Sequence, residues 1–453
     1  MVTSYRQFIN EIYEEHVEEA SFLYEQRLAL MLDADLSWFS FFSEEQTLDA
    51  HLDGLIIGAE RALSISQQIA LEGDVGAIYT LLSLWCLRNN RNKFLSELDN
   101  FDLEDVEVQQ AIQLALLHRM PVDWCGELLQ KVLDQQPVLL LLFIPVLIKH
   151  QQMPANLAFK QLYNSIVTNE QADVSPCIQG IYYYSDLDTD ALLTHFILNG
   201  SKKEKSAAVL VLLRLGRKSV VEQTLAKVKQ KNAPLLSFAL GAPATFFSNL
   251  IETNTASNWN ENNIKCLAIS GLADHIPELI KLLKDESVAN FAAKALFMIT
   301  GTRLIDNVFQ EESWDKADLF DEEIEEFEQG KMPQRTDGRA FGETIEQISL
   351  SLETWLDWWK QNHTQYISGT RYRLGVPISP VALVKTLSFE FVDNEIRELT
   401  YQELTIRYNA KHFFSTEELI QAQQKSILAL YQWATTVENN FTPGQFYLSG
   451  NIQ

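Results

Sequence analysis

The stretch from Gly271 to Gly301 constrains the fold of this chain most, because it reads as two short helices joined by a polar break. Ser287 stands where the N-cap of the second helix is expected. Gly301 follows that helix, where a left-handed residue commonly ends a helix. Helices this short are not stable alone in water. Such a hairpin is therefore stable only when stacked on similar ones. The first helix has its apolar residues on one face: Ile276, Leu279, Ile280 and Leu283.

Similar apolar helix endings recur along the chain about every 30 residues, a period typical of helical-hairpin arrays. The endings lie near Arg88, His118, Lys149, Ser185, Gly216, Gly241, Gly271 and Gly301. We therefore predict an all-α protein built as an α-solenoid. Its expected regions are an N-terminal helical region (1–73), the repeat array (74–301), an acidic and aromatic linker or insertion (302–342), and a helical C-terminal region (343–453).

The charge of the chain excludes some classes of partner. It carries 61 Asp and Glu against 36 Lys and Arg, a net charge of −25. Nucleic acids and anionic membranes need clustered cations, so we expect neither as a partner. A basic protein would be attracted, although an acidic surface can also serve solubility alone.

Several features predict a cytoplasmic protein. The most apolar run, 138–148, is too short to span a bilayer and contains Pro145. The four cysteines are widely spaced, which fits buried thiols in a reducing compartment. The first residues lack the basic and then apolar pattern of a secretory signal.

Motifs for catalysis are absent: the sequence contains no GxxxxGK[ST], GxGxxG, GxSxG or HExxH. Asp186, Asp188 and Asp190 have the spacing of a calcium loop, but Ala191 and Ile197 replace the glycine and glutamate that such a loop needs. We expect helix capping there instead. The sequence thus predicts no enzyme, no metal and no cofactor.

The segment 306–329 combines acid with aromatic residues, holding eleven acidic residues against one lysine. A solvated acidic linker would be poorer in aromatics. The segment is either a flexible acidic loop or a segment that docks, on its own chain or on a basic partner. The residues predicted to bind a protein are Glu311, Glu312, Trp314, Asp318, Phe320, Asp321, Glu322, Glu323, Glu325, Glu326 and Phe327.

Three motifs carry a resemblance to a known family. The first is an EEAxFL core with a following arginine: Glu18, Glu19, Ala20, Phe22, Leu23 and Arg27. The second is LxAHLDGL: Leu48, Ala50, His51, Leu52, Asp53, Gly54 and Leu55. The third is RYxLGxP: Arg371, Tyr372, Leu374, Gly375 and Pro377. In these the chain resembles an uncharacterised HEAT-like family of Gram-negative bacteria, often encoded with type VI secretion genes. The chain departs from that family after Leu387.

The resemblance implies short HEAT-type repeats and a non-enzymatic protein-binding scaffold, an adaptor or chaperone for a secretion effector or spike component. An alternative is an immunity-type inhibitor of a basic toxin. A further alternative is a bilin-lyase-like enzyme, because bilin lyases contain short HEAT-type repeats similar to 271–301. The expected partner is a basic protein.

Single residues carry further expectations. Arg27 is expected to pair with a glutamate near the N-terminus and to stabilise the fold. His51 and Asp53 are two positions apart on a helix, so they point to different faces and cannot act as an acid–base pair. Apolar spacing predicts a helix over 343–361, and Ser379 before Pro380 predicts another helix start.

Overall fold

The computed structural model describes two compact units. Unit 1 comprises residues 1–246 with 379–453, and unit 2 comprises Phe247–Ile378. These boundaries differ from the four regions expected from the sequence. The residues described are 5–33, 36–134, 139–153, 163, 167, 174–183, 189–229, 232–253, 259–312, 314, 319, 324, 327–335 and 338–453.

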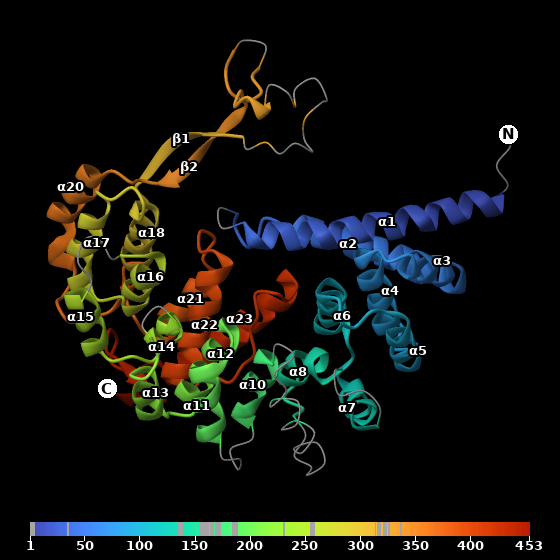
Figure 1. The fold of residues 1–453 in the computed structure, drawn as a ribbon, viewed down its shortest axis with the longest axis horizontal. Helices are drawn as coiled ribbons and strands as arrows, with labels where there is room; N and C mark the ends of the chain where they lie inside the picture. Colours follow the sequence, from blue (N-terminus) through green and yellow to red (C-terminus); the bar gives the residue numbers. More distant parts are fainter. Residues whose placement is uncertain are drawn as a thin grey trace. The chain divides into compact units, whose positions relative to one another are not determined.

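Unit 1 begins with α1 (Tyr5–Leu32), α2 (Phe42–Ile57) and α3 (Ala59–Leu71). Helix α1 packs on α2, α3 and α4 (Figure 1). Helices α2 and α3 are separate because the chain turns at Gly58, and Ala59 adopts a positive φ of 51°. A β-carbon at Gly58 would lie 2.6 Å from the Tyr13 ring, so glycine permits this close approach.

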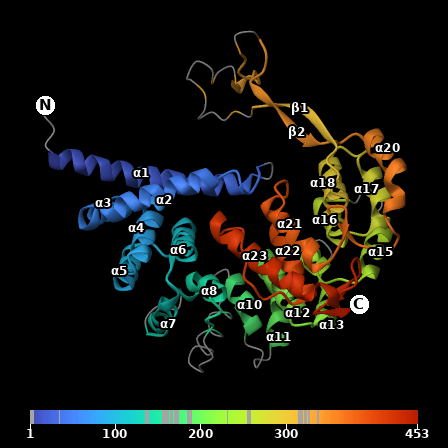
Figure 2. The same ribbon diagram turned by 180° about the vertical axis from the view of Figure 1, so that it is seen from behind.

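The even-numbered helices of unit 1 from α4 to α14 form a continuous stack. They are α4 (Val75–Leu87), α6 (Val106–Arg119), α8 (Leu139–Lys149), α10 (Ser175–Gly180) and α12 (Lys202–Arg214), followed by the short α14 (Leu235–Ala239). Each packs on the next (Figure 2). The intervening helices are α5 (Arg91–Glu97), α7 (Cys125–Asp134), α11 (Thr189–Asn199) and α13 (Lys218–Leu225). The helix endings predicted near Arg88, His118, Lys149, Gly216 and Gly241 are confirmed, whereas Ser185 lies outside the described residues.

The C-terminal part of unit 1 consists of α21 (Pro380–Ser388), α22 (Asn394–Tyr408), α23 (Ile420–Val437) and the short hairpin β5 (Tyr447–Leu448) and β6 (Asn451–Ile452). Helix α21 packs on α22 and α23, and α22 packs on α12. Ser379 caps α21 by accepting from the Ala382 N–H at 3.2 Å, as the sequence predicts.

Unit 2 contains the helical hairpin predicted over 271–301. Helix α15 (Ala244–Thr253) spans the boundary between the units and is followed by α16 (Glu261–Ser270), α17 (Ile276–Leu282) and α18 (Ala289–Thr300). Gly271 and Gly301 both end their helices at a φ of 68°, as expected. The prediction that Ser287 is the N-cap of the second helix was wrong. Helix α18 begins at Ala289, and the Ser287 hydroxyl donates to Asp285 instead.

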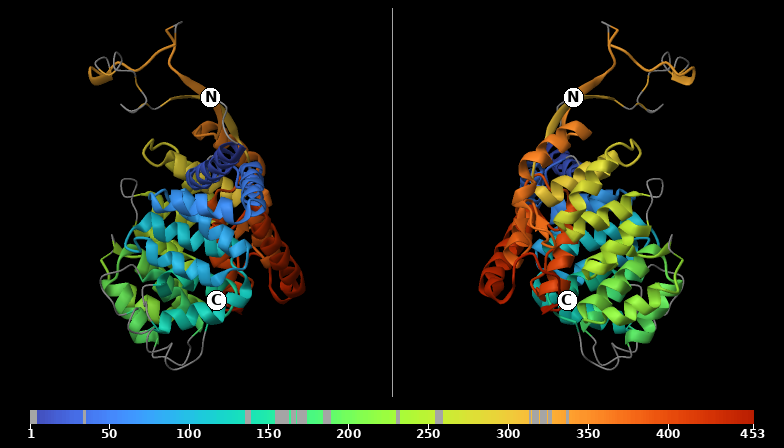
Figure 3. Two further views of the ribbon diagram at one scale, coloured as in Figure 1. Left: turned by 90° about the vertical axis from the view of Figure 1, so that its right-hand side faces the viewer. Right: turned by 90° about the vertical axis from the view of Figure 1, so that its left-hand side faces the viewer.

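The rest of unit 2 is partly extended, which the sequence did not predict. Strand β1 (Ile305–Glu311) pairs antiparallel with β2 (Gly342–Ile348), and this ribbon projects from the helices of unit 2 (Figure 3). The predicted helix 343–361 is therefore wrong over 343–351, nearly its first half: α20 spans Leu352–Asn362 and is capped by Ser351. β-Branched residues such as Thr344 and Ile345 favour the strand. A second hairpin pairs β3 (Tyr372–Arg373) with β4 (Val376–Pro377).

Taken together, the described residues are mostly helical, and their sheets have two strands each. Short 3-10 turns connect several helices: η1 (Leu98–Asn100), η2 (Val122–Trp124), η3 (Ile181–Tyr183), η5 (Ala273–His275), η7 (His363–Gln365) and η8 (Glu438–Asn440). All four cysteines are free and buried, as expected. None of the helices in the described ranges is long and apolar enough to cross a bilayer.

A buried histidine joins α16 to α17. Ser270 Oγ donates to the Leu267 carbonyl at 2.6 Å, so it accepts from His275 Nδ1, 2.8 Å away. This arrangement requires a proton on Nδ1. His275 is 3% exposed, and burial lowers its pKa to about 4. The folded chain therefore resists protonation of this ring.

We predict that His275 makes the stability of the chain pH-dependent. The unfolded ring takes up a proton near pH 6.5, whereas the folded ring does so only near pH 4. Stability is therefore lost as the pH falls below 6.5, by about 1 kcal/mol at pH 5.5. His275→Phe should lose less stability than the wild type between pH 7.5 and pH 5.5, measured by thermal denaturation. Equal losses of stability in His275→Phe and the wild type would contradict the prediction that His275 causes the pH dependence.

Candidate functional site

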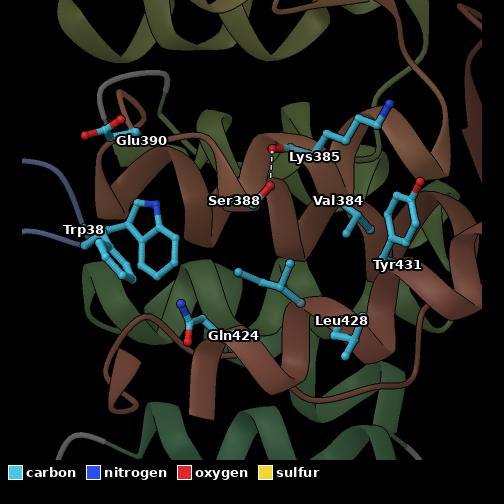
Figure 4. Close-up of a pocket in the computed structure, with 10 residues that line it drawn as sticks. Trp38, Val384, Lys385, Ser388, Glu390, Gln424, Leu428 and Tyr431 are labelled. Atoms are coloured by element: carbon cyan, nitrogen blue, oxygen red, sulfur yellow. Dashed lines mark hydrogen bonds between the residues drawn. The ribbon is translucent and has the colours of Figure 1, made fainter. Parts of the chain in front are cut away.

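An apolar groove lies in unit 1 between α21, α23 and the connection before α2. It has a volume of about 570 Å³. Figure 4 shows the side chains that line the groove, which come from these three segments and, for Glu390, from the connection after α21. The lining residues are Trp38, Phe39, Val384, Lys385, Ser388, Glu390, Gln424, Ile427, Leu428 and Tyr431.

The inner wall of the groove is held rigidly. Trp38 is 5% exposed, and the guanidinium carbon of Arg397 lies 4.0 Å from the centroid of its ring. Arg397 is positioned by hydrogen bonds to the Leu387 carbonyl at 2.8 Å and to the Gln423 side chain at 2.7 Å. Burial lowers the pKa of Arg397 to about 9, which leaves it charged at neutral pH. The cation therefore fixes the tryptophan that forms this wall.

The outer part of the groove exposes large apolar side chains to solvent. Leu428 is 57% exposed, Phe39 41% and Tyr431 40%. Phe389 and Phe391 flank the groove residue Glu390 in the sequence, and both are also exposed. An exposed apolar group of this kind, with polar residues at its edge, is typical of a binding surface. The polar edge is formed by Lys385, Glu390 and Gln424.

The acidic segment predicted to bind a protein begins at the end of β1 in unit 2. Glu311 ends β1, and the Glu312 N–H donates to the Phe341 carbonyl at 3.0 Å. Trp314 contacts the ring of Phe341 edge-to-face at 5.4 Å. Phe327 is also described and half-buried. The other predicted residues lie outside the described ones: Asp318, Phe320, Asp321, Glu322, Glu323, Glu325 and Glu326.

Arg27 of the first motif has a structural role. It is 2% exposed, and its Nε donates to Glu45 at 2.8 Å. Its Nη2 donates to the carbonyls of Glu417 and Glu418, at 3.0 and 2.9 Å. The expected ion pair is thus present, but its partner is Glu45 of α2. Burial raises the pKa of Glu45 despite this pairing.

The other residues of the first two motifs lie on the surface or between α1 and α2. Glu18, Glu19 and Asp53 are exposed, and Phe22 is 57% exposed. His51 Nδ1 lies 3.0 Å from His16 Nδ1, and burial lowers the pKa of His51. A β-carbon at Gly54 would lie 3.0 Å from the His16 ring, so the glycine makes room for this histidine pair.

The third motif holds two helix ends of unit 2. Arg371 is fully buried and donates to the carbonyls of Ser270 at 2.7 Å and Ile269 at 3.0 Å. The Tyr372 N–H donates to the Gly271 carbonyl at 2.7 Å, and the Gly375 N–H to the Ile299 carbonyl at 2.9 Å. Pro377 lies in β4, the partner strand of β3. These residues bind the chain's own backbone, so the structure gives the motif a role in packing.

The groove was missed by sequence reasoning because its walls are more than 300 positions apart in the chain. The aromatic connection at 38–42 was a visible signal, and Leu428 lies outside the apolar stripe of α23. Neither the aromatic connection nor Leu428 indicates, from the sequence alone, that the two segments lie side by side. Only the packing of α21 and α23 beside Trp38 brings them together.

Within the described ranges, no group of three or more His, Cys, Asp or Glu residues is arranged to hold a metal ion. Asp190, from the calcium-like spacing, lies in α11 at 3.9 Å from Arg217, while Asp186 and Asp188 lie outside the described residues. The chain matches no protein-family profile, no curated protein and no solved structure.

We predict that Arg27→Met destabilises the fold by about 3 kcal/mol, because it leaves the Glu45 carboxyl buried without its cation. The measurement is the free energy of unfolding in urea. Arg88→Met is the matched control, since its partner Glu60 is 88% exposed and keeps its solvation without the cation. That change should cost less than about 1 kcal/mol. Similar losses in the two variants would contradict the structural role of Arg27.

Proposed function

We propose that this chain is a non-enzymatic protein-binding scaffold whose helices form an α-solenoid of HEAT-like hairpins. The recurring helix endings and the successive packing of α4, α6, α8, α10 and α12 support this architecture. The exposed apolar groove at Trp38, Leu428 and Tyr431 is the observation that carries the function. The resemblance in the three motifs favours an adaptor or chaperone for a basic type VI secretion effector or spike component.

The face of the helix stack that scaffolds of this kind use for binding is partly covered by the chain itself. His118 of α6 lies 2.9 Å from the Glu417 carbonyl, and Lys149 of α8 pairs with the Glu418 side chain at 2.9 Å. Helix α22 covers α12. We therefore place the partner in the groove that the C-terminal helices form, and not directly on the stack.

The chemistry of the groove favours an amphipathic helix as the bound segment. Its polar groups are side chains at the edge, which cannot pair with a row of backbone groups. A segment that buries its backbone there must satisfy its own N–H and C=O groups, as a helix does. The net charge of −25 favours association with a basic partner at low salt.

We predict that Leu428→Glu weakens partner binding, because it places a carboxylate in the apolar groove. The wild-type chain, tagged and recovered from its native bacterium at low salt, should carry one basic protein that is released at high salt. A photo-crosslinker at Tyr431 should attach to a helix of that protein. Leu428→Glu should reduce recovery by about tenfold, equivalent to about 1.4 kcal/mol.

Ile57→Glu is the matched control, since Ile57 is 83% exposed and lies outside the groove. It should retain the partner, and both variants should keep the wild-type thermal midpoint. Retention of the partner by Leu428→Glu would contradict the proposed site. A coloured small-molecule adduct without any protein would contradict the scaffold and favour a lyase-like enzyme.

A further inference from the structure

The β1–β2 ribbon of unit 2 lacks the support that two-stranded sheets need. In the described part of the chain, its residues from Asn307 to Glu311 are exposed, with Phe309 at 49% and Val308 at 37%. Of its two strands, β2 has the larger contact with α18. A two-stranded ribbon is marginally stable in water, and a third strand or a packed face stabilises it.

One edge of the ribbon presents backbone groups for which the described residues provide no hydrogen-bond partner. The Ser349 N–H donates to the Leu304 carbonyl at 2.7 Å, and the Glu312 N–H donates to the Phe341 carbonyl at 3.0 Å. In an antiparallel pair, alternate residues direct their backbone groups to the partner strand. The even-numbered residues of β1 therefore bond to β2, and the odd-numbered ones point outward. The described chain provides no hydrogen-bond partner for the outward groups of Asn307, Phe309 and Glu311.

The charge of the ribbon determines what can pair with this edge. The segments 305–312 and 342–348 contain five acidic residues and no lysine or arginine: Asp306, Glu311, Glu312, Glu343 and Glu346. Arg303 pairs with Glu346 at 3.6 Å. A second copy of this ribbon would place carboxylates opposite carboxylates, which is destabilising. A strand carrying lysine or arginine would bring opposite charges together.

We propose that the free edge of β1 binds an extended, basic segment of a partner protein by strand addition. The outward N–H and C=O groups of Asn307, Phe309 and Glu311 pair with the backbone of that segment. Because successive side chains of a strand point to opposite faces, its cations lie beside Glu311 on one face and its apolar side chains beside Val308 on the other. The completed three-stranded sheet stabilises the ribbon. This surface is separate from the groove of unit 1 and is independent of the function proposed for that groove.

The test uses the full-length chain and a short fluorescent peptide that alternates lysine and valine. The peptide should bind at low salt, measured by fluorescence anisotropy, and should slow hydrogen exchange in 305–311. A peptide that alternates glutamate and valine should not bind. Phe309→Pro removes an outward N–H but leaves the bonds to β2 in place, because proline is tolerated at such edge positions. It should weaken binding by about tenfold or more.

Thr344→Pro is the matched control, because Thr344 lies opposite Phe309 on β2 and points its N–H to the other edge. It should bind the peptide as the wild type does. Equal binding by Phe309→Pro and the wild type, equal loss in both proline variants, or failure of the wild type to bind would each overturn the proposal. Leu428→Glu should bind the peptide as the wild type does. The experiment therefore distinguishes a failure of the groove proposal from a failure of the ribbon proposal.

Discussion

Buried arginines that donate to backbone carbonyls hold this structure together at the points where distant segments meet. Arg27 joins α1 to the carbonyls before α23. Arg371 binds the carbonyls at the end of α16. Arg407 is fully buried and donates to Glu403 at 2.9 Å and to the Ala239 carbonyl at 3.1 Å. The guanidinium group suits this role, because its several N–H donors lie in one plane and remain charged.

This use of arginine follows from the problem that short helices create. Each helix leaves its last carbonyls without partners inside the helix. In a long array of short helices many such ends become buried, and each needs a donor. Gly271 and Gly301 allow the chain to turn there, and Arg371 and the backbone of 372–375 supply donors to these ends. Loss of one arginine would leave several carbonyls unpaired at once.

The same contacts determine which surfaces of unit 1 remain open. The segment before α23 binds α1, α6 and α8 through the backbone and side chains of Glu417 and Glu418. The C-terminal helices thereby cover part of the helix stack, and their outer side forms the apolar groove at Leu428. Glu45 and Glu403 are buried with two of these arginines, so the surface keeps nearly the whole net charge of −25.

The sequence alone determined the helices and where most of them end, because apolar spacing and left-handed glycines such as Gly301 are local signals. It also identified Arg27 as half of a buried pair. It failed at 343–348, where the spacing of Ile345 and Ile348 fits a helix but the residues pair with β1. Strand pairing depends on a segment more than 30 positions away, which local spacing does not encode. The groove was decided by tertiary structure for the same reason: Trp38 and Leu428 become neighbours only when α21 and α23 pack beside the connection before α2.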